Sequence, residues 1–181
     1  MSNYIAILRG INVGGHRKIP MEGLRKEIGN LGYKNIKTYI QSGNIIFTAA
    51  AHHSDLEIAE HIEKMILTTF GFEVPVIVRN SDELQQTVSE NPFLTTENTS
   101  IEGLHVTFLK ETPSPETLEN IKTYTYPPDK FEIRQKNVFL YIPGSYHKTK
   151  LSNAFFEKKL NVQATTRNWK TVQKLAEMSD F

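Results

Sequence analysis

Residues 36–47 read IKTYIQSGNIIF, two short runs rich in isoleucine and aromatic residues that are separated by Gln-Ser-Gly-Asn. Each run has the composition of a β-strand. Glycine and asparagine can adopt the positive φ angle that a tight turn needs, so the segment predicts an antiparallel hairpin. A hairpin at this place disfavours the parallel crossover on which a dinucleotide-binding fold depends.

The segments on either side of the hairpin complete a known order of elements. Residues 4–8 form a short apolar run that predicts a buried strand, and a helix is expected from Pro20 until Gly32 ends the helical spacing. After the hairpin, residues 54–70 predict a long amphipathic helix and residues 74–78 a further strand. The resulting βαββαβ order is that of the ferredoxin-like fold, or α/β plait.

The same order recurs in the second half of the chain. The expected strands are 104–109, 131–134, 138–142 and 162–165, and the expected helices are 81–88, 114–121, 152–160 and 168–178. A polar loop is expected over residues 95–100. The sequence therefore predicts an α+β protein made of tandem ferredoxin-like units with antiparallel sheets and an extra C-terminal helix. The predicted domains are residues 1–80 and 81–181.

The composition is that of a folded protein. Apolar residues make up 39% of the chain, charged residues 23% and aromatic residues 10%, which excludes a disordered protein. No apolar run approaches the roughly 18 residues that cross a bilayer, and no signal-like segment opens the chain, so neither secretion nor a membrane partner is expected. The absence of cysteine excludes disulfides and thiolate chemistry and fits a cytoplasmic location.

The charges are unevenly distributed although the formal net charge is only +1. Residues 1–48 carry a local net charge of +5 and residues 136–174 one of +7, whereas residues 49–135 carry −9. If the two basic segments meet in space, they favour an anionic partner. The alternative is that they are solvated helix faces that differ in charge.

The loop after the first strand carries the strongest signal for a binding site. Residues 9–18 read RGINVGGHRK. Backbone amides of a glycine-rich turn, the positive end of the following helix and nearby cationic side chains can together hold a phosphate or carboxylate. The loop is not a nucleoside-triphosphate-binding loop, because His16 and Arg17 stand where that motif has Lys and Ser/Thr. Glycines that merely form turns are the alternative. The candidate ligand-binding residues here are Arg9, Asn12, Gly14, Gly15 and Lys18.

The hairpin tip contributes a second set of candidates. Gln41, Ser42 and Asn44 concentrate neutral hydrogen-bonding groups, which could either contact a ligand or satisfy the turn itself. Ser42 is a poor candidate for a nucleophile, because no histidine and acid stand in a recognisable arrangement with it.

A third set stands at the start of the C-terminal helix. Arg167, Asn168 and Trp169 place a guanidinium and an indole beside a helix N-terminus, which would suit a phosphate attached to a stacked base. Alternatively, Thr166 or Asn168 caps the helix and Trp169 anchors it on the core.

The remaining polar residues show no catalytic or metal-binding pattern. His52, His53 and His61 lack the spacing of a metal site, and the acids form no pair typical of glycosidases. A catalytic role for His147 has no support. No metal and no cofactor are therefore expected, and no catalytic residue can be assigned.

Three motifs resemble the signatures of a bacterial protein family, domain of unknown function 1697. They are residues 8–15 (LRGINVGG) followed by 18–21 (KIPM), residues 39–44 (YIQSGN) and residues 164–172 (ATTRNWKTV). The resemblance runs from one end of the chain to the other. It implies a tandem pair of ferredoxin-like α/β plaits, and it brings no substrate, catalytic residue or cofactor.

Three classes of function remain open. The first is binding of a nucleotide, another phosphorylated small molecule or single-stranded nucleic acid at a basic pocket formed by the N-terminal loop and the Arg-Asn-Trp segment. The second is a transferase or hydrolase acting on a phosphorylated substrate. The third is a non-catalytic module that binds another protein. The sequence gives no indication of the oligomeric state.

Overall fold

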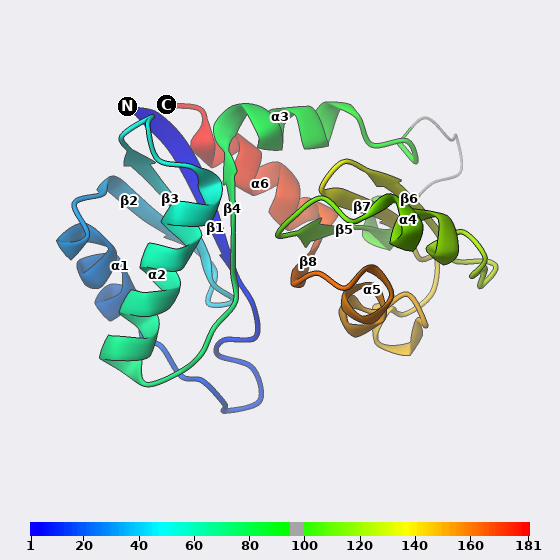
Figure 1. Cartoon of the computed structure of the whole chain (residues 1–181), viewed down its shortest axis with the longest axis horizontal. Helices are drawn as coiled ribbons and strands as arrows, with labels where there is room; N and C mark the ends of the chain where they lie inside the picture. The colour runs from blue at the N-terminus through cyan, green and yellow to red at the C-terminus, as the bar shows by residue number, and fades with distance from the viewer. Residues whose placement is uncertain (95–99) are drawn as a thin grey trace. The chain divides into compact units, whose positions relative to one another are not determined.

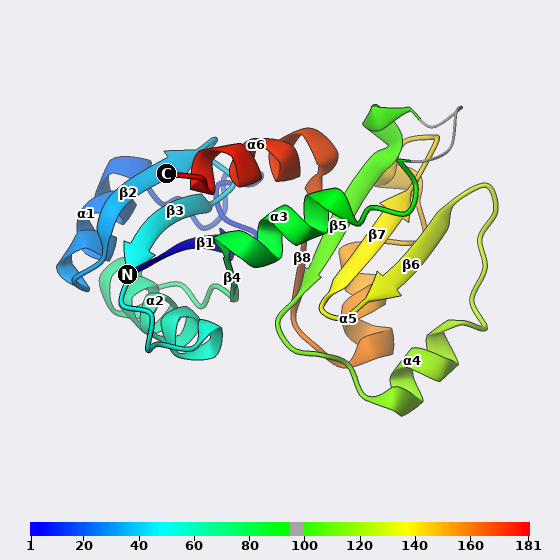
Figure 2. The same ribbon diagram turned by 90° about the horizontal axis from the view of Figure 1, so that it is seen from above.

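The computed structural model describes residues 1–94 and 100–181, so the polar loop expected over 95–100 lies outside the described residues except for Ser100. Within the described residues, two four-stranded antiparallel sheets and six α-helices form a mixed α+β protein (Figures 1 and 2). The chain divides into two compact units, residues 1–86 with 174–181 and residues 87–173.

The first unit contains the predicted hairpin. Its elements are β1 (Ser2–Leu8), α1 (Met21–Asn30), β2 (Lys34–Tyr39), β3 (Asn44–Ala49), α2 (Asp55–Phe70) and β4 (Val76–Asn80). The sheet has the order β2-β3-β1-β4, in which β1 pairs antiparallel with both β3 and β4. Both helices were predicted, and the ends of α2 show why. Ser54 and Glu57 form a capping box at its start, and Gly71 adopts the left-handed conformation at its end.

The core of the first unit lies between α1, α2 and one face of the sheet. Every second residue of β1 faces this core, because successive strand side chains point to opposite faces. The helices contribute Leu24, Ile28, Ile58, Ile62 and Ile66, and the strands contribute Ala6, Leu8, Ile45, Phe47, Val76 and Val78. Figure 1 shows both helices beside this sheet.

Residues 174–181 return to the first unit, which the sequence did not indicate. Asn3 donates its side-chain amide to the carbonyl of Ser179 at 3.0 Å, and Gln85 donates to the carbonyl of Ala176 at 2.7 Å. The division between the units therefore falls within α3 (Ser81–Ser89) and α6 (Trp169–Ser179), whereas the sequence placed one boundary after residue 80.

The second unit repeats the element order of the first. It contains β5 (Leu104–Leu109), α4 (Pro115–Ile121), β6 (Lys130–Arg134), β7 (Asn137–Tyr141), α5 (Asn153–Leu160) and β8 (Ala164–Asn168), with short 3₁₀ turns η1 (Ile101–Gly103) and η2 (Tyr146–Lys148). Its sheet has the order β6-β7-β5-β8, which Figure 2 shows from above. Ile121 of α4 and Phe156 and Leu160 of α5 pack in the core of this unit.

None of the helices in the described part of the chain combines the length and the hydropathy needed to cross a bilayer.

Candidate functional site

The glycine-rich loop is held in place by the side chain of Asn12. Its amide donates to the carbonyl of Ile19 at 3.0 Å and to the carbonyl of Gln41 at 2.8 Å, and its Oδ1 accepts from the backbone N–H of Ile19 at 2.9 Å. Asn12 has a φ of 54°, a left-handed conformation that asparagine tolerates better than most residues. One side chain thus closes the loop and joins it to the hairpin tip, which is 29 residues further along the chain.

The hairpin tip is tied to the same loop through glycine. Gly43 has a φ of 89°, and a Cβ placed on it would lie only 2.7 Å from the Cβ of Leu8 and 2.9 Å from Cδ1 of Ile11. Its carbonyl accepts from the backbone N–H of Leu8 at 2.8 Å. Only glycine allows the tip to approach the end of β1 this closely.

Asn44 has a role within the turn. It is fully buried, and its amide donates to the carbonyl of Tyr39 and to Oγ of Ser42, both at 3.0 Å. These bonds fit the alternative in which the polar residues of the tip satisfy the turn.

A cavity of about 380 Å³ opens where the loop and the hairpin tip meet. Its lining consists of Asn12, Gly15, Lys18, Ile19, Pro20, Met21 and Gln41. Four of the candidates from the sequence, Asn12, Gly15, Lys18 and Gln41, are therefore brought together. The candidates Arg9, Gly14, Ser42 and Asn44 are not among these lining residues. Small-molecule sites typically measure roughly 300–1,000 Å³, so the cavity could hold a small metabolite.

The electrostatics of this cavity favour an anion. Lys18 is the charged residue of its lining, and no carboxylate is among the seven lining residues. The helix α1 starts at the cavity with Pro20 as its N-cap, and no side chain caps it. The first-turn N–H groups of α1 therefore lack the side-chain acceptor that Ser, Thr or Asp would supply. An uncapped helix N-terminus carries a partial positive charge, which the exposed carboxylate of Glu22 in the first turn of α1 offsets in part.

The C-terminal candidates lie in the second unit. Arg167 is half-buried and donates to Oγ1 of Thr165 at 2.9 Å and to the carbonyl of Thr166 at 3.0 Å, and burial lowers its pKa to about 10. Asn168 accepts from the backbone N–H of Thr171 at 2.9 Å and so caps α6, and Trp169 is fully buried. The indole consequently presents no ring face to solvent. That this segment shares a pocket with the N-terminal loop stays a prediction.

The first unit contains a counterpart of this segment that the sequence reasoning missed. Arg79 and Asn80 end β4 as Arg167 and Asn168 end β8, and a helix follows each pair directly. Arg79 donates to the carbonyl of the preceding Val78 at 3.0 Å, and Asn80 accepts from the N–H of Glu83 at 2.8 Å. The Arg-Asn dipeptide, which occurs at the corresponding place in both halves of the sequence, could have indicated this correspondence.

The charge of Arg79 is balanced within its own unit. The side chain is almost completely buried, and burial lowers its pKa to about 10, while the carboxylates of Glu83 and Asp55 oppose this shift. The Arg-Asn pair is thus a structural element that ends the last strand of each unit and starts the following helix. This gives Asn168 a role that needs no ligand.

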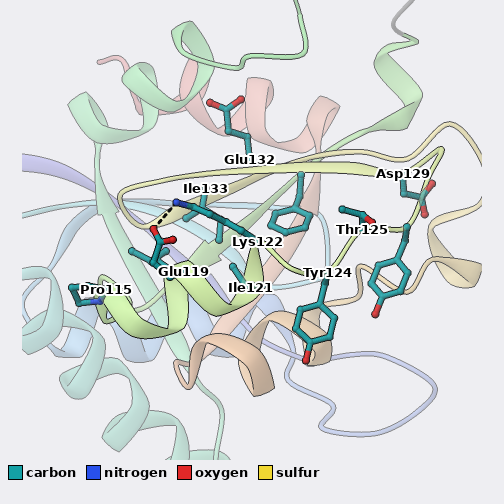
Figure 3. A pocket seen from close by; sticks show the side chains of 12 residues that line it. Pro115, Glu119, Ile121, Lys122, Tyr124, Thr125, Asp129, Glu132 and Ile133 are labelled. Carbon is teal, nitrogen blue, oxygen red and sulfur yellow. Dashed lines mark hydrogen bonds and ion pairs between the residues drawn. The ribbon is translucent and has the colours of Figure 1, made fainter.

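A larger cavity, of about 610 Å³, lies in the second unit between α4, the loop that follows it and β6 (Figure 3). Its lining is largely apolar and includes Leu118, Ile121, Tyr124, Tyr126, Phe131 and Ile133. Its charged side chains have protein partners, since Lys122 pairs with Glu119 at 2.7 Å, Arg134 pairs with Glu132 at 2.9 Å, and Asp129 accepts from the hydroxyl of Thr149 at 2.6 Å. Figure 3 shows the Glu119–Lys122 pair apart from Asp129. This cavity offers an apolar surface, and none of the sequence candidates lines it.

The histidines near α2 contact one another. The ring centroids of His52 and His53 lie 4.3 Å apart, and those of His53 and His61 lie 5.8 Å apart. Tyr33 Oη is 3.3 Å from Nδ1 of His61. Among residues 1–94 and 100–181, no group of three or more His, Asp or Glu side chains is arranged to hold a metal ion.

By the architecture of its described residues, the chain is an α+β protein with two four-stranded antiparallel sheets. It belongs to the family described as protein of unknown function DUF1697, whose model matches residues 1–139. The first two motifs from the sequence lie within this match, and residues 164–172 lie beyond it.

The whole chain resembles a solved structure. The conserved bacterial protein SP0830 from Streptococcus pneumoniae shares 21% sequence identity, with 99% of each chain covered and a TM-score of 0.73. At this identity the resemblance shows the fold alone. A comparison with curated proteins gave no match.

Proposed function

We propose that this protein binds a phosphate-bearing ligand in the 380 Å³ cavity of its first unit. The observation that carries the proposal is the composition of the cavity, which combines Lys18, the glycine-rich turn at Gly15 and the uncapped start of α1 without a lining carboxylate. Backbone N–H groups at a helix start, together with a nearby ammonium, form a general site for anions. The local net charge of +5 over residues 1–48 acts in the same direction.

The proposed ligand class includes nucleotides, other phosphorylated metabolites and single-stranded nucleic acid. In a wider version of the proposal, Arg9 and Arg167 also contact the ligand, as the two basic segments of the sequence suggest. A cytoplasmic location is part of the same proposal and is supported by the absence of cysteine.

The architecture we infer for this protein is a tandem of two ferredoxin-like units. The two sheets have corresponding orders, β2-β3-β1-β4 and β6-β7-β5-β8. The Arg-Asn pair at the end of the last strand of each unit supports a duplication. In this interpretation the second unit lacks the long loop of residues 9–20, so the cavity formed by that loop has no counterpart in the second unit.

The experiment is a thermal-shift titration of the full-length chain with adenosine monophosphate and with inorganic phosphate, at low and moderate salt. A ligand at 100 times its dissociation constant should add about 2.7 kcal/mol to the free energy of unfolding. Lys18→Gln removes the charge from the cavity, whereas Lys26→Gln removes an exposed lysine of α1 outside the lining. We expect a salt-sensitive stabilisation that Lys18→Gln abolishes and Lys26→Gln preserves.

Two results would contradict the proposal. Equal loss of stabilisation in both lysine variants would indicate a diffuse charge effect, and no stabilisation by any phosphate compound would leave a protein-interaction module as the better explanation. Turnover of a bound phosphate ester would assign the protein to the transferases or hydrolases.

A further inference from the structure

Ile40 has a backbone conformation that its side chain disfavours. It is the first residue of the turn between β2 and β3 and has a φ of 51°. The left-handed region costs L-residues roughly 1–2 kcal/mol, and β-branched residues are rarely found there. Asn12 and Asn35 show the residue type that suits this conformation, with φ angles of 54° and 53°.

The side chain of Ile40 gains little from the protein core in return. Half of its surface, 50%, is exposed to solvent. It is absent from the buried core of the first unit and from the partly buried residues packed against that core. Glycine or asparagine at this position would relieve the strain and would give up only the buried half of the isoleucine side chain. A strained residue with half of its surface in solvent is a reason to look for a functional contact.

Ile40 is a sequence neighbour of the cavity of the first unit, although it is not among the seven residues that line it. The next residue, Gln41, lines the cavity, and its carbonyl accepts the 2.8 Å hydrogen bond from Asn12. On the other side of this bond, Asn12 is followed by Val13, which is 62% exposed. Each of the two chain segments that meet at the cavity thus carries an exposed β-branched side chain next to a lining residue.

The lining itself is partly apolar. Besides Lys18 and the two amide side chains, it contains Ile19, Pro20 and Met21. A purely polar anion such as pyrophosphate would leave this apolar surface wet. A phosphate ester that carries a flat ring would cover it, since burial of apolar surface is favourable in proportion to its area.

We propose that Ile40 and Val13 are specificity-determining residues that contact the ring of a phosphorylated aromatic compound, the chemistry shared by nucleotides and other ring-bearing phosphate esters. The inference rests on the proposed function. The phosphate binds at Lys18 and the start of α1, and the ring packs against the exposed β-branched side chains. In this proposal, the backbone strain at Ile40 is retained because the isoleucine side chain increases the affinity for the ring.

The test compares three probes on the full-length chain by calorimetric titration: adenosine monophosphate, ribose 5-phosphate and pyrophosphate. Adenosine monophosphate and ribose 5-phosphate share the phosphate and the sugar and differ in the base. We expect wild type to bind adenosine monophosphate about tenfold more tightly than ribose 5-phosphate, a ratio that corresponds to about 1.4 kcal/mol. Ile40→Asn should reduce this preference several-fold and leave the affinity for ribose 5-phosphate unchanged.

The variants distinguish the loss of a contact with the ring from a loss of stability of the protein. Ile40→Asn should raise the melting temperature of the free protein, because asparagine tolerates a φ of 51° better than isoleucine does. Val13→Thr, at an exposed position, should also reduce the preference, and Leu56→Asn, which removes another exposed apolar side chain from α2, should not. Equal affinity of wild type for the two sugar phosphates would overturn the inference and leave the proposed function intact. Failure of all three probes to bind would overturn both.

Discussion

Single residues decide whether the two loops of the first unit can meet. The side chain of Asn12 spans from the glycine-rich loop to Gln41, and Gly43 lets the hairpin tip approach Leu8 and Ile11. The turn at Gly43 was indicated in the sequence by residue type, since Asn and Gly favour positive φ angles, and Asn12 was predicted as a ligand-binding residue. Their partners were not, because a contact across 29 residues depends on how the sheet pairs.

Replacing Gly43 by alanine should be among the most destabilising single-methyl changes in the chain. The new Cβ would lie 2.7 Å from Leu8 Cβ, at a φ of 89°. Backbone strain and overpacking together should lower the free energy of unfolding by about 3 kcal/mol. Gly32 is the matched control, with a φ of 90° and nothing within 4 Å of an added Cβ.

Gly32→Ala should therefore show the strain alone, about 1 kcal/mol. Urea denaturation of both variants measures the difference. Equal losses in the two variants would mean that the close approach at Gly43 does not exist in solution.

His105 should make the stability of the protein sensitive to acid. Burial lowers the pKa of His105, whose ring stacks on Tyr146 with centroids 4.7 Å apart. In the unfolded chain a histidine titrates near pH 6.5, so below that pH the unfolded state binds more protons than the folded state. The stability that neutral His105 contributes is present above pH 6.5 and is lost as the pH falls through its lowered folded value.

His105→Phe keeps an aromatic ring against Tyr146 and removes the titrating group. The variant should lose less stability than wild type between pH 7.5 and pH 5, measured by thermal denaturation at each pH. An identical loss in both proteins would show that His105 titrates as it does in the unfolded chain.

At the scale of elements, the last strand of each unit ends in an asparagine that caps the following helix. Asn80 caps α3 through the N–H of Glu83 at 2.8 Å, and Asn168 caps α6 through the N–H of Thr171 at 2.9 Å. An N-cap asparagine satisfies one N–H group of the first helical turn, which would otherwise lack a partner in the helix.

Asn80→Ala and Asn168→Ala should each lower the free energy of unfolding by about 1 kcal/mol, whereas the corresponding Asp variants should stay close to wild type. Chemical denaturation of the four variants tests this. If Asn168→Ala were neutral for stability and harmful for phosphate binding, Asn168 would be a ligand contact rather than a cap.

The elements were predictable from the sequence wherever their periodicity or their caps were local. The hairpin of β2 and β3, the capping box at Ser54 and the end of α2 at Gly71 depend on residues close together in the chain. The buried role of Asn44 and Trp169 was only one of two alternatives, because residue type alone does not show burial. Arg79 lies in the acidic segment of residues 49–135, outside the two basic segments that indicated a binding site.

At the scale of the whole molecule, the division of the chain could not be deduced from element order. The last residues, 174–181, belong to the first unit through bonds such as those from Asn3 to the carbonyls of Ser179 and Phe181. These bonds join residues more than 170 positions apart, and no local pattern encodes them. The family match and the resemblance to SP0830 establish family and fold, and the site rests on the cavity alone.

The most direct test of the account is to locate a bound phosphate ester on the full-length chain, whose 20.7 kDa suits backbone nuclear magnetic resonance. Adenosine monophosphate is titrated into ¹⁵N-labelled protein, and amide shifts are mapped onto the sequence. The proposed site predicts saturable shifts centred on residues 12–21 and 40–42, reduced by Lys18→Gln. Shifts confined to residues 115–133, which line the apolar cavity of the second unit, or no shifts at all, would contradict it.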